Sequence, residues 1–244
     1  MTNANPTPDS SAPASVIASS WWPITLLAAF LLMVTMGTRQ TMGLFISPIN
    51  SSTGLGIVSI SFALAVGQFM WGVAQPIAGA FADRYGPGRV LAVGVIILAF
   101  GTALIPFVSN QWMLIISMGM LTAIGSGACS FSVLLGAVAP SLPAANRGTA
   151  SGVINAGGSF GQFVFAPIAQ KLIASVGWMN AQWAMAVMIL LTLPITAKLR
   201  RLPKLLPVNR RVKGCAPPFA MPSRIAAIYY CTPAFSLAAF TLRF

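Results

Sequence analysis

The chain contains little charge and almost no acid. Its 244 residues include two Asp or Glu residues, 14 Lys or Arg residues and no histidine, and charged residues make up 7% of the total. Acid–base catalysis and metal binding depend on grouped carboxylates, imidazoles and thiolates. The three cysteines, Cys129, Cys215 and Cys231, have neither metal-ligand spacing nor a histidine partner. We therefore expect no enzyme activity, no cofactor and no metal site.

Long apolar runs dominate the chain instead. Hydrophobic residues make up 57% of it, and its mean hydropathy is +0.83. A membrane-spanning helix needs about 20 mainly apolar residues. Six runs reach that length, roughly 23–48, 57–80, 90–108, 112–136, 149–173 and 177–197. Because backbone polar groups in lipid must be paired within their own segment, the sequence predicts an all-α membrane protein with six transmembrane helices.

The placement of basic residues predicts orientation and boundaries. With a cytoplasmic N-terminus, Arg84, Arg89 and Arg147 all lie in cytoplasmic loops. We expect residues 1–21, which are rich in Ser, Pro, Asn and Ala, to form a disordered cytoplasmic tail, and residues 22–198 to form the six-helix unit in a plasma or bacterial inner membrane. The net charge of +12 is scattered over short loops and a tail, so the expected partner is the lipid bilayer and not nucleic acid.

The polar segment between the second and third runs, GAFADRYGPGR, is the most specific motif in the chain. We expect a tight, wet turn there. Gly79, Asp83, Arg84, Gly86 and Arg89 fit the pattern G-x-L-A-D-R-x-G-R-R-R. The segment resembles the cytoplasmic signature loop of the major facilitator superfamily of transporters. This resemblance implies that the chain is the N-terminal half of such a transporter and that its loop residues take part in gating, with Asp83 and Arg84 holding the cytoplasmic side closed.

A weak internal echo supports that fold class. Pro76 to Ala78 reads P-I-A and begins ten residues before Gly86, and Pro167 to Ala169 reads P-I-A and begins ten residues before Gly177. The echo fits the three-plus-three inverted repeat of one facilitator half. The alternative is chance, because this tripeptide is common in apolar sequence.

Glycines are frequent in the fourth and fifth runs, where small residues let helices approach closely. They are Gly119, Gly125, Gly127 and Gly136 in the fourth run, and Gly148, Gly152, Gly157, Gly158 and Gly161 in the fifth. The stretch from Arg147 to Gln162 also resembles the start of the fifth helix of the superfamily. Asn155 and Gln162 lie seven residues apart on one helix face. Each is a candidate to line a substrate cavity or to bridge to a neighbouring helix, and bridging is the favoured interpretation.

Arg39 is the strongest candidate for a functional residue. It lies 17 residues beyond Trp22 and 10 before Ile49, well inside the first run. An arginine at such a depth costs about 2.5–3.5 kcal/mol on insertion scales. No carboxylate lies in the six runs. A water-filled cavity, a carbonyl cluster or an anionic substrate must therefore stabilise the guanidinium, and the alternative is a purely structural arginine.

The sequence around Arg39 suggests a substrate class. Gly37 to Ile49 resembles the first helix of the oxalate/formate antiporter and monocarboxylate transporter branch of the superfamily. The resemblance implies antiport or other transport of small organic anions, monocarboxylates or dicarboxylates, by alternating access. Arg39 is then an anion contact, with Gln40 as a second candidate. The alternatives are a facilitator-type carrier of drugs or sugars, and a six-helix membrane protein that does not transport.

The end of the chain departs from this pattern. Residues 199–244 are basic, rich in proline and free of acid. Read one base out of frame, Tyr229 to Cys231 must encode two leucines, and the following sequence permits GFFTCGFHIAF, which resembles a seventh helix. We expect this tail to be out of frame from about Leu202 and the C-terminal six-helix half to be missing, so that the chain inserts but is inactive alone. A natural six-span protein with a basic tail is the alternative.

Overall fold

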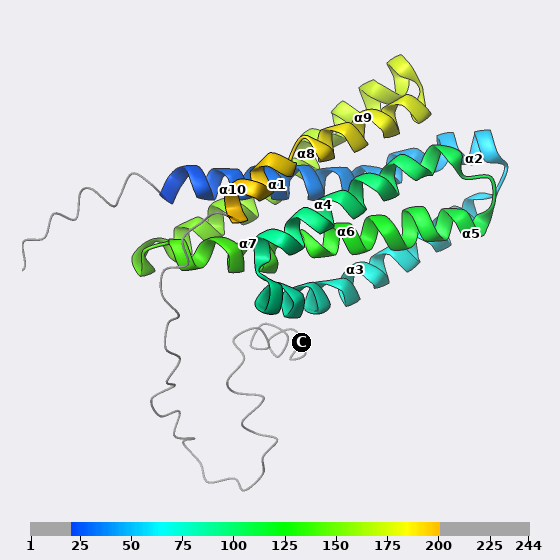
Figure 1. Cartoon of the computed structure of the whole chain (residues 1–244). Coiled ribbons are helices and arrows are strands. Elements are labelled where there is room, and N and C mark those ends of the chain that lie inside the picture. The colour runs from blue at the N-terminus through cyan, green and yellow to red at the C-terminus, as the bar shows by residue number, and fades with distance from the viewer. Residues whose placement is uncertain (1–20, 201–244) are drawn as a thin grey trace, which may run out of the picture. The chain divides into compact units, whose positions relative to one another are not determined.

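The structure, a computed structural model, describes residues 21–200, and all of them belong to one structural unit, Met1–Leu206 (Figure 1). Every regular element in this range is a helix, which confirms the predicted all-α class. The tail from Leu202 that was expected to be out of frame lies outside the described residues, as does most of the expected N-terminal tail.

The helices follow one another with short connections. In chain order they are α1 Trp21–Thr41, η1 Met42–Phe45, α2 Ile46–Thr53, α3 Ile57–Tyr85, α4 Pro87–Leu104, η2 Ile105–Phe107, α5 Gln111–Leu114, η3 Ile115–Leu121, α6 Thr122–Ala128, α7 Phe131–Val138, η4 Ala139–Ser141, η5 Ala144–Asn146, α8 Arg147–Val176, α9 Trp178–Leu190 and α10 Leu193–Arg200. Here η1, η2, η4 and η5 are 3₁₀ turns and η3 is a π-helical stretch.

Five stretches of the described chain are long and apolar enough to cross a membrane. They are Trp21–Thr53, Ile57–Tyr85, Pro87–Phe107, Gln111–Ser141 and Trp178–Leu199. The helix α8 has 30 residues but is not among the five, because small and polar residues lower its hydropathy. Five of the six predicted spans are therefore apolar helices of sufficient length, and a membrane-spanning role for α8 stays a prediction.

The helical unit is slightly longer than predicted at both ends. Trp21, assigned to the disordered tail, begins α1, is buried and stacks on the ring of Trp22 at a centroid distance of 4.2 Å. Leu199, assigned to the basic tail, lies in α10 and is also buried. Both boundaries therefore move outward by one or two residues, because these apolar side chains pack against the helical unit.

The signature segment is helical and not a turn over most of its length. The helix α3 continues through Gly79, Asp83 and Arg84 to Tyr85, and α4 begins at Pro87. The whole change of direction occurs at Gly86, with φ 92° and ψ 137°. Residues with a side chain rarely adopt this conformation, and proline is well suited to the first position of the next helix. The expectation that the segment as a whole forms a tight turn was therefore wrong, because the turn is confined to Gly86.

The two P-I-A segments adopt the same local structure. Pro76 lies inside α3 and Pro167 inside α8, and in each case a glycine with positive φ ends the helix ten residues later. Gly177 has φ 82°, close to the value at Gly86. The next helix begins immediately in both places. The echo in the sequence thus corresponds to a local echo in structure, while the inverted repeat as a whole remains a prediction.

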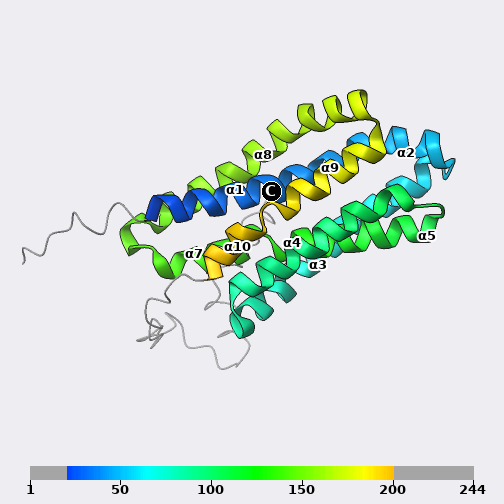
Figure 2. The same cartoon turned by 45° about the horizontal axis from the view of Figure 1, so that its top comes forward.

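The helix α1 packs most extensively against α8, and Figures 1 and 2 show the two helices side by side. Glycines of α8 make this possible, since a Cβ on Gly157 would lie 2.8 Å from the Ala29 carbonyl oxygen and one on Gly161 2.7 Å from Met33 Cα. The prediction of close packing holds for these glycines. It was wrong for Gly136, Gly148 and Gly152, where an added Cβ would have no neighbouring group within 4 Å.

A second set of contacts joins α3 and α4 to the helix formed by η3 and α6. Gly67 of α3 faces Gly119 of η3, and a Cβ on Gly67 would lie 3.3 Å from the Gly119 carbonyl oxygen. Between α4 and α6, a Cβ on Gly125 would lie 2.7 Å from Leu98 Cα. The first approach fixes α3 relative to η3 and the second fixes α4 relative to α6. The helix α3 carries the side chains that contact Arg39.

Candidate functional site

Arg39 lies in the interior of a long helical segment. It belongs to α1, and the continuous apolar stretch that contains it runs from Trp21 to Thr53. Its side chain is partly buried. Two residues earlier, Gly37 lies against the ring of Phe165 of α8, with a hypothetical Cβ 2.6 Å from Phe165 Cδ2. The α1–α8 contact therefore fixes the backbone that carries Arg39 and directs its side chain toward α3.

Two residues of α3 hold the guanidinium. Arg39 Nη2 donates a hydrogen bond to Gln68 Oε1. Arg39 Cζ lies over the ring of Trp71, 4.2 Å from its centroid. Gln68 and Trp71 are three residues apart and therefore lie on the same side of α3. The aromatic face attracts the cation, while the amide oxygen accepts from one of its donors.

No carboxylate neutralises this charge among residues 21–200. Asp83 is the one acidic residue in that range, and it is exposed. It lies twelve residues beyond Trp71 on the same helix, about 18 Å along the axis. A guanidinium has five N–H donors. Within the described residues, the side chain of Arg39 makes one hydrogen bond, so most of its donors remain for an anion.

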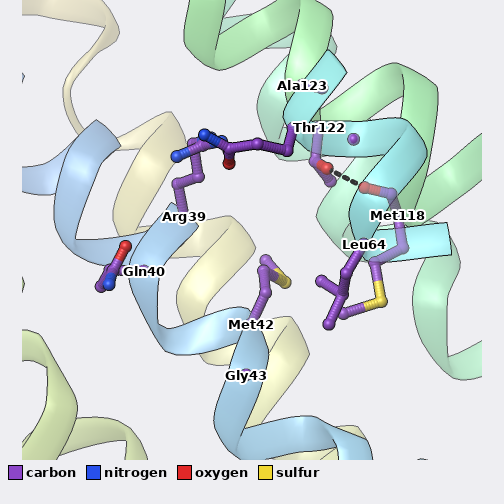
Figure 3. Close-up of a pocket in the computed structure, with 10 residues that line it drawn as sticks. Arg39, Gln40, Met42, Gly43, Leu64, Met118, Thr122 and Ala123 are labelled. Carbon is purple, nitrogen blue, oxygen red and sulfur yellow. Dashed lines mark hydrogen bonds between the residues drawn. The ribbon is translucent and has the colours of Figure 1, made fainter. Parts of the chain in front are cut away.

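A pocket of about 190 Å³ surrounds Arg39. Its lining comprises Arg39, Gln40, Met42, Gly43, Leu64, Gly67, Gln68, Met118, Thr122 and Ala123. The hydroxyl of Thr122 donates to the Met118 carbonyl oxygen (Figure 3). A cavity of about 150 Å³ is large enough for a molecule of the size of benzene. The pocket is therefore large enough for a small organic ion, and its lining offers one cationic group, the amides of Gln40 and Gln68, and the side chain of Thr122.

Helix irregularities flank the pocket on both sides. The 3₁₀ turn η1 begins at Met42, three residues after Arg39, and it contributes Met42 and Gly43. The π-helical stretch η3 contributes Met118. Short departures from α-helical geometry of both kinds occur frequently at functional sites. Their position here gives a second, independent reason to regard the pocket as functional.

The other predicted site residues lie apart from the guanidinium. Gln40 lines the same pocket, but Figure 3 shows its amide pointing away from Arg39. Asn155 and Gln162 are exposed on α8, and neither makes a side-chain hydrogen bond to another helix within residues 21–200. The favoured interpretation of these two residues as bridges to a neighbouring helix is therefore not supported.

The predicted gating residues cluster where α3 meets α4. Asp83, Arg84 and Arg89 are all exposed. Arg84 Cζ lies 5.5 Å from the centroid of the Tyr85 ring. Gly79 lies within α3, and Gly86 forms the break between the helices. The cluster is far along α3 from Gln68, so the structure separates it from the pocket.

Sequence reasoning missed Gln68 and Trp71. The signal was present, because an amide and an indole occur three residues apart in the second apolar run, where most residues are aliphatic. What the sequence lacks is the distance between this pair and Arg39, which lies 29 residues earlier in the chain than Gln68. Tertiary packing brings them together, because α1 and α3 both pack against α6.

The chain resembles known transporters over most of its length. The family model of the Major Facilitator Superfamily matches residues 25–242. This range includes the basic tail expected to be out of frame, and that expectation stays a prediction. The fold is similar to that of the inward-open xylose transporter XylE from E. coli, with a TM-score of 0.63 and 17% identity, over 75% of this chain and 48% of that chain.

Two curated relatives illustrate the range of the family. The Fujikurins efflux protein of Gibberella fujikuroi is 30% identical over 159 residues, which is 64% of this chain and 33% of that protein. Monocarboxylate transporter 13 of Rattus norvegicus is 27% identical over 161 residues, 66% of this chain and 37% of that protein. The chain thus spans roughly a third of the length of these relatives. The matched range, the helical fold and these relatives agree that the chain belongs to the Major Facilitator Superfamily, a family of membrane transporters and not of enzymes.

Proposed function

We propose that the chain forms one half of a transporter for small organic anions, either monocarboxylates or dicarboxylates, and that Arg39 binds the substrate carboxylate. The observation that carries this proposal is the guanidinium itself. It extends from the interior of a long apolar helix and lines a pocket. It has no carboxylate partner among the described residues, and most of its N–H donors remain unused there. An arginine fork binds a carboxylate through two parallel hydrogen bonds.

The similarity to monocarboxylate transporter 13 supports the same substrate class. A transporter of organic cations needs a buried carboxylate more than a buried arginine, and residues 21–200 contain no acidic residue near the pocket. Gln40 completes the polar lining on α1, and Asn155 and Gln162 are left as candidates to face the substrate from α8 in a complete transporter.

The remaining features of the transporter are part of the proposal. The chain crosses the membrane six times as a three-plus-three repeat, with a cytoplasmic N-terminus, in a plasma or bacterial inner membrane. Because it spans about a third to a half of its relatives' length, translocation needs a second six-helix unit facing the Arg39 pocket. Alternating access then exposes the pocket to each side in turn, and Asp83 and Arg84 hold the cytoplasmic side closed.

Binding of carboxylates to the purified chain in lipid nanodiscs tests the proposal. Sodium acetate and sodium oxalate should raise the unfolding temperature above that in sodium chloride of equal ionic strength, since a ligand that binds the folded state stabilises it. Arg39→Ala should abolish this rise, and Arg39→Lys should retain part of it because the charge survives without the fork. Arg147→Ala, at an exposed arginine outside the pocket, is the matched control. An undiminished rise in Arg39→Ala contradicts the proposal.

A second candidate function is efflux of another class of compound, such as a drug, since the Gibberella relative is named an efflux protein. Arg39 would then serve the structure of the bundle through Gln68 and Trp71. The same assay separates the two, because stabilisation by apolar or cationic dyes that persists in Arg39→Ala, with none by acetate or oxalate, favours efflux.

A further inference from the structure

We propose that Gln68 is an internal stand-in for the substrate: its amide oxygen accepts a hydrogen bond from Arg39, and the substrate carboxylate displaces it. The inference rests on the proposed function, since it takes Arg39 as the anion contact. It adds a residue that tunes affinity and that the sequence did not indicate.

The hydrogen bond from Arg39 to Gln68 uses a nitrogen that a carboxylate also needs. A guanidinium offers a carboxylate two forked edges, one formed by Nη1 with Nη2 and one by Nε with Nη2. Gln68 Oε1 accepts from Nη2, the nitrogen common to both edges. Nη2 carries two hydrogens, one on each edge, so a carboxylate that takes the edge used by Gln68 must displace the amide, whereas one on the other edge shares Nη2 with it. The neutral amide is the weaker acceptor, because both bonds involve the ionised guanidinium but only the carboxylate adds a charge of its own and a second parallel hydrogen bond.

Trp71 contacts a different part of the guanidinium of Arg39 from the part that Gln68 contacts. The indole ring lies against a face of the guanidinium, with Arg39 Cζ 4.2 Å from the ring centroid. A forked carboxylate approaches in the plane of the guanidinium and not over its face. Trp71 therefore leaves the donors unoccupied and keeps the cation in place when Gln68 departs. Trp71 thus supports the guanidinium of Arg39 permanently, whereas Gln68 is a hydrogen-bond acceptor that can be displaced.

The surroundings of Gln68 allow it to leave. Its side chain is exposed in the described part of the chain, and its neighbour Gly67 fixes the backbone against Gly119. The amide can change rotamer while the backbone beneath it stays in place. The amide of Gln68 gives the guanidinium of Arg39 a hydrogen-bond partner until a carboxylate replaces it. It also weakens binding, because the apparent Kd equals the intrinsic Kd divided by the fraction of molecules in which Gln68 has left Arg39 free.

Substitution of Gln68 distinguishes a stand-in from a substrate contact. The full chain in nanodiscs is titrated with sodium acetate and with sodium oxalate, and the apparent Kd is taken from the rise in unfolding temperature. Gln68→Ala should lower the apparent Kd at least about fivefold, because no hydrogen bond to a charged group has to be broken. Gln68→Glu should remove the response to both anions and raise the unfolding temperature in their absence, because a permanent carboxylate pairs with Arg39. Gln75→Glu, at the same residue type seven positions further along α3, is the charge-matched control and should do neither.

Each outcome bears on the inference. A Kd for Gln68→Ala that is unchanged or higher than that of the wild type overturns it, and if Arg39→Ala still abolishes binding, the proposed function survives. Anion binding that appears in Gln68→Ala but is too weak to measure in the wild type supports it most directly. No binding by either protein overturns the inference together with the proposed function.

Discussion

The contact between α1 and α8 should be intolerant of a single added methyl group at Gly161. A Cβ at this position would lie 2.7 Å from Met33 Cα and 2.8 Å from Met33 C, and it would also contact the Met33 carbonyl oxygen. These are backbone atoms, so no side-chain rotation relieves the overlap. Ordinary contact begins at 3.4 Å, so α1 and α8 must separate by more than about 0.7 Å, because the Met33 carbonyl oxygen lies closer still.

The magnitude follows from two opposing terms. Overpacking a well-packed contact costs about 1–3 kcal/mol. Replacing glycine by alanine inside a helix recovers about 1 kcal/mol of helix propensity. Gly152 lies in the same helix with no atom within 4 Å of its hypothetical Cβ, so Gly152→Ala receives only the favourable term. We expect Gly161→Ala to be less stable than Gly152→Ala by about 1–3 kcal/mol, or roughly 3–10 °C in unfolding temperature.

Cys129 provides the readout. It is fully buried, and its thiol donates to the Leu91 carbonyl oxygen at 3.6 Å. With Cys215 and Cys231 replaced by serine, it is the only thiol of the chain. A thiol-reactive fluorophore then reports unfolding in detergent or nanodiscs during a temperature ramp. If Gly161→Ala reacts at the same temperature as Gly152→Ala, or at a higher one, the close approach of α1 and α8 is not present in the molecule.

Two further predictions concern residues outside the pocket. Asp83→Asn, in a transport-competent protein that contains this chain, should slow carboxylate uptake with little change in Kd, because the loop acts on gating. Asp9→Asn, at the other acidic residue, is the control, and normal uptake by Asp83→Asn counts against a gating role. Gln182 is fully buried in α9, and neither polar atom of its amide has a hydrogen-bond partner among the described residues. Gln182→Met keeps the length of the side chain and should stabilise the chain by about 1–3 kcal/mol in the Cys129 assay, whereas a lower unfolding temperature would reveal a partner for this amide.

Much of the fold was accessible from the sequence because the bilayer imposes a local rule. Apolar runs of sufficient length must be helices, and all six predicted runs are helical, five of them long and apolar enough to cross a membrane. The rule makes no prediction where a segment is less apolar, as in α8. It also makes none where a helix continues beyond its apolar run into an amphipathic end. The signature segment illustrates the second case, because its charged residues indicate water while their backbone continues α3 to Tyr85. The charged residues indicate that the segment is exposed to solvent. The position of the turn is indicated only by Gly86, the residue that breaks the helix.

The candidate site divides in the same way. The sequence by itself determined that an arginine lies inside a membrane helix without a carboxylate partner, because depth and composition are properties of one segment. It did not determine what the guanidinium contacts. Gln68 and Trp71 contact Arg39 because α1 and α3 both pack against α6, and the neighbouring α1–α8 and α3–η3 contacts depend on close approaches at glycines. The insertion cost of a charge is local and can be read from a sequence, whereas the partner that offsets it is selected by tertiary packing.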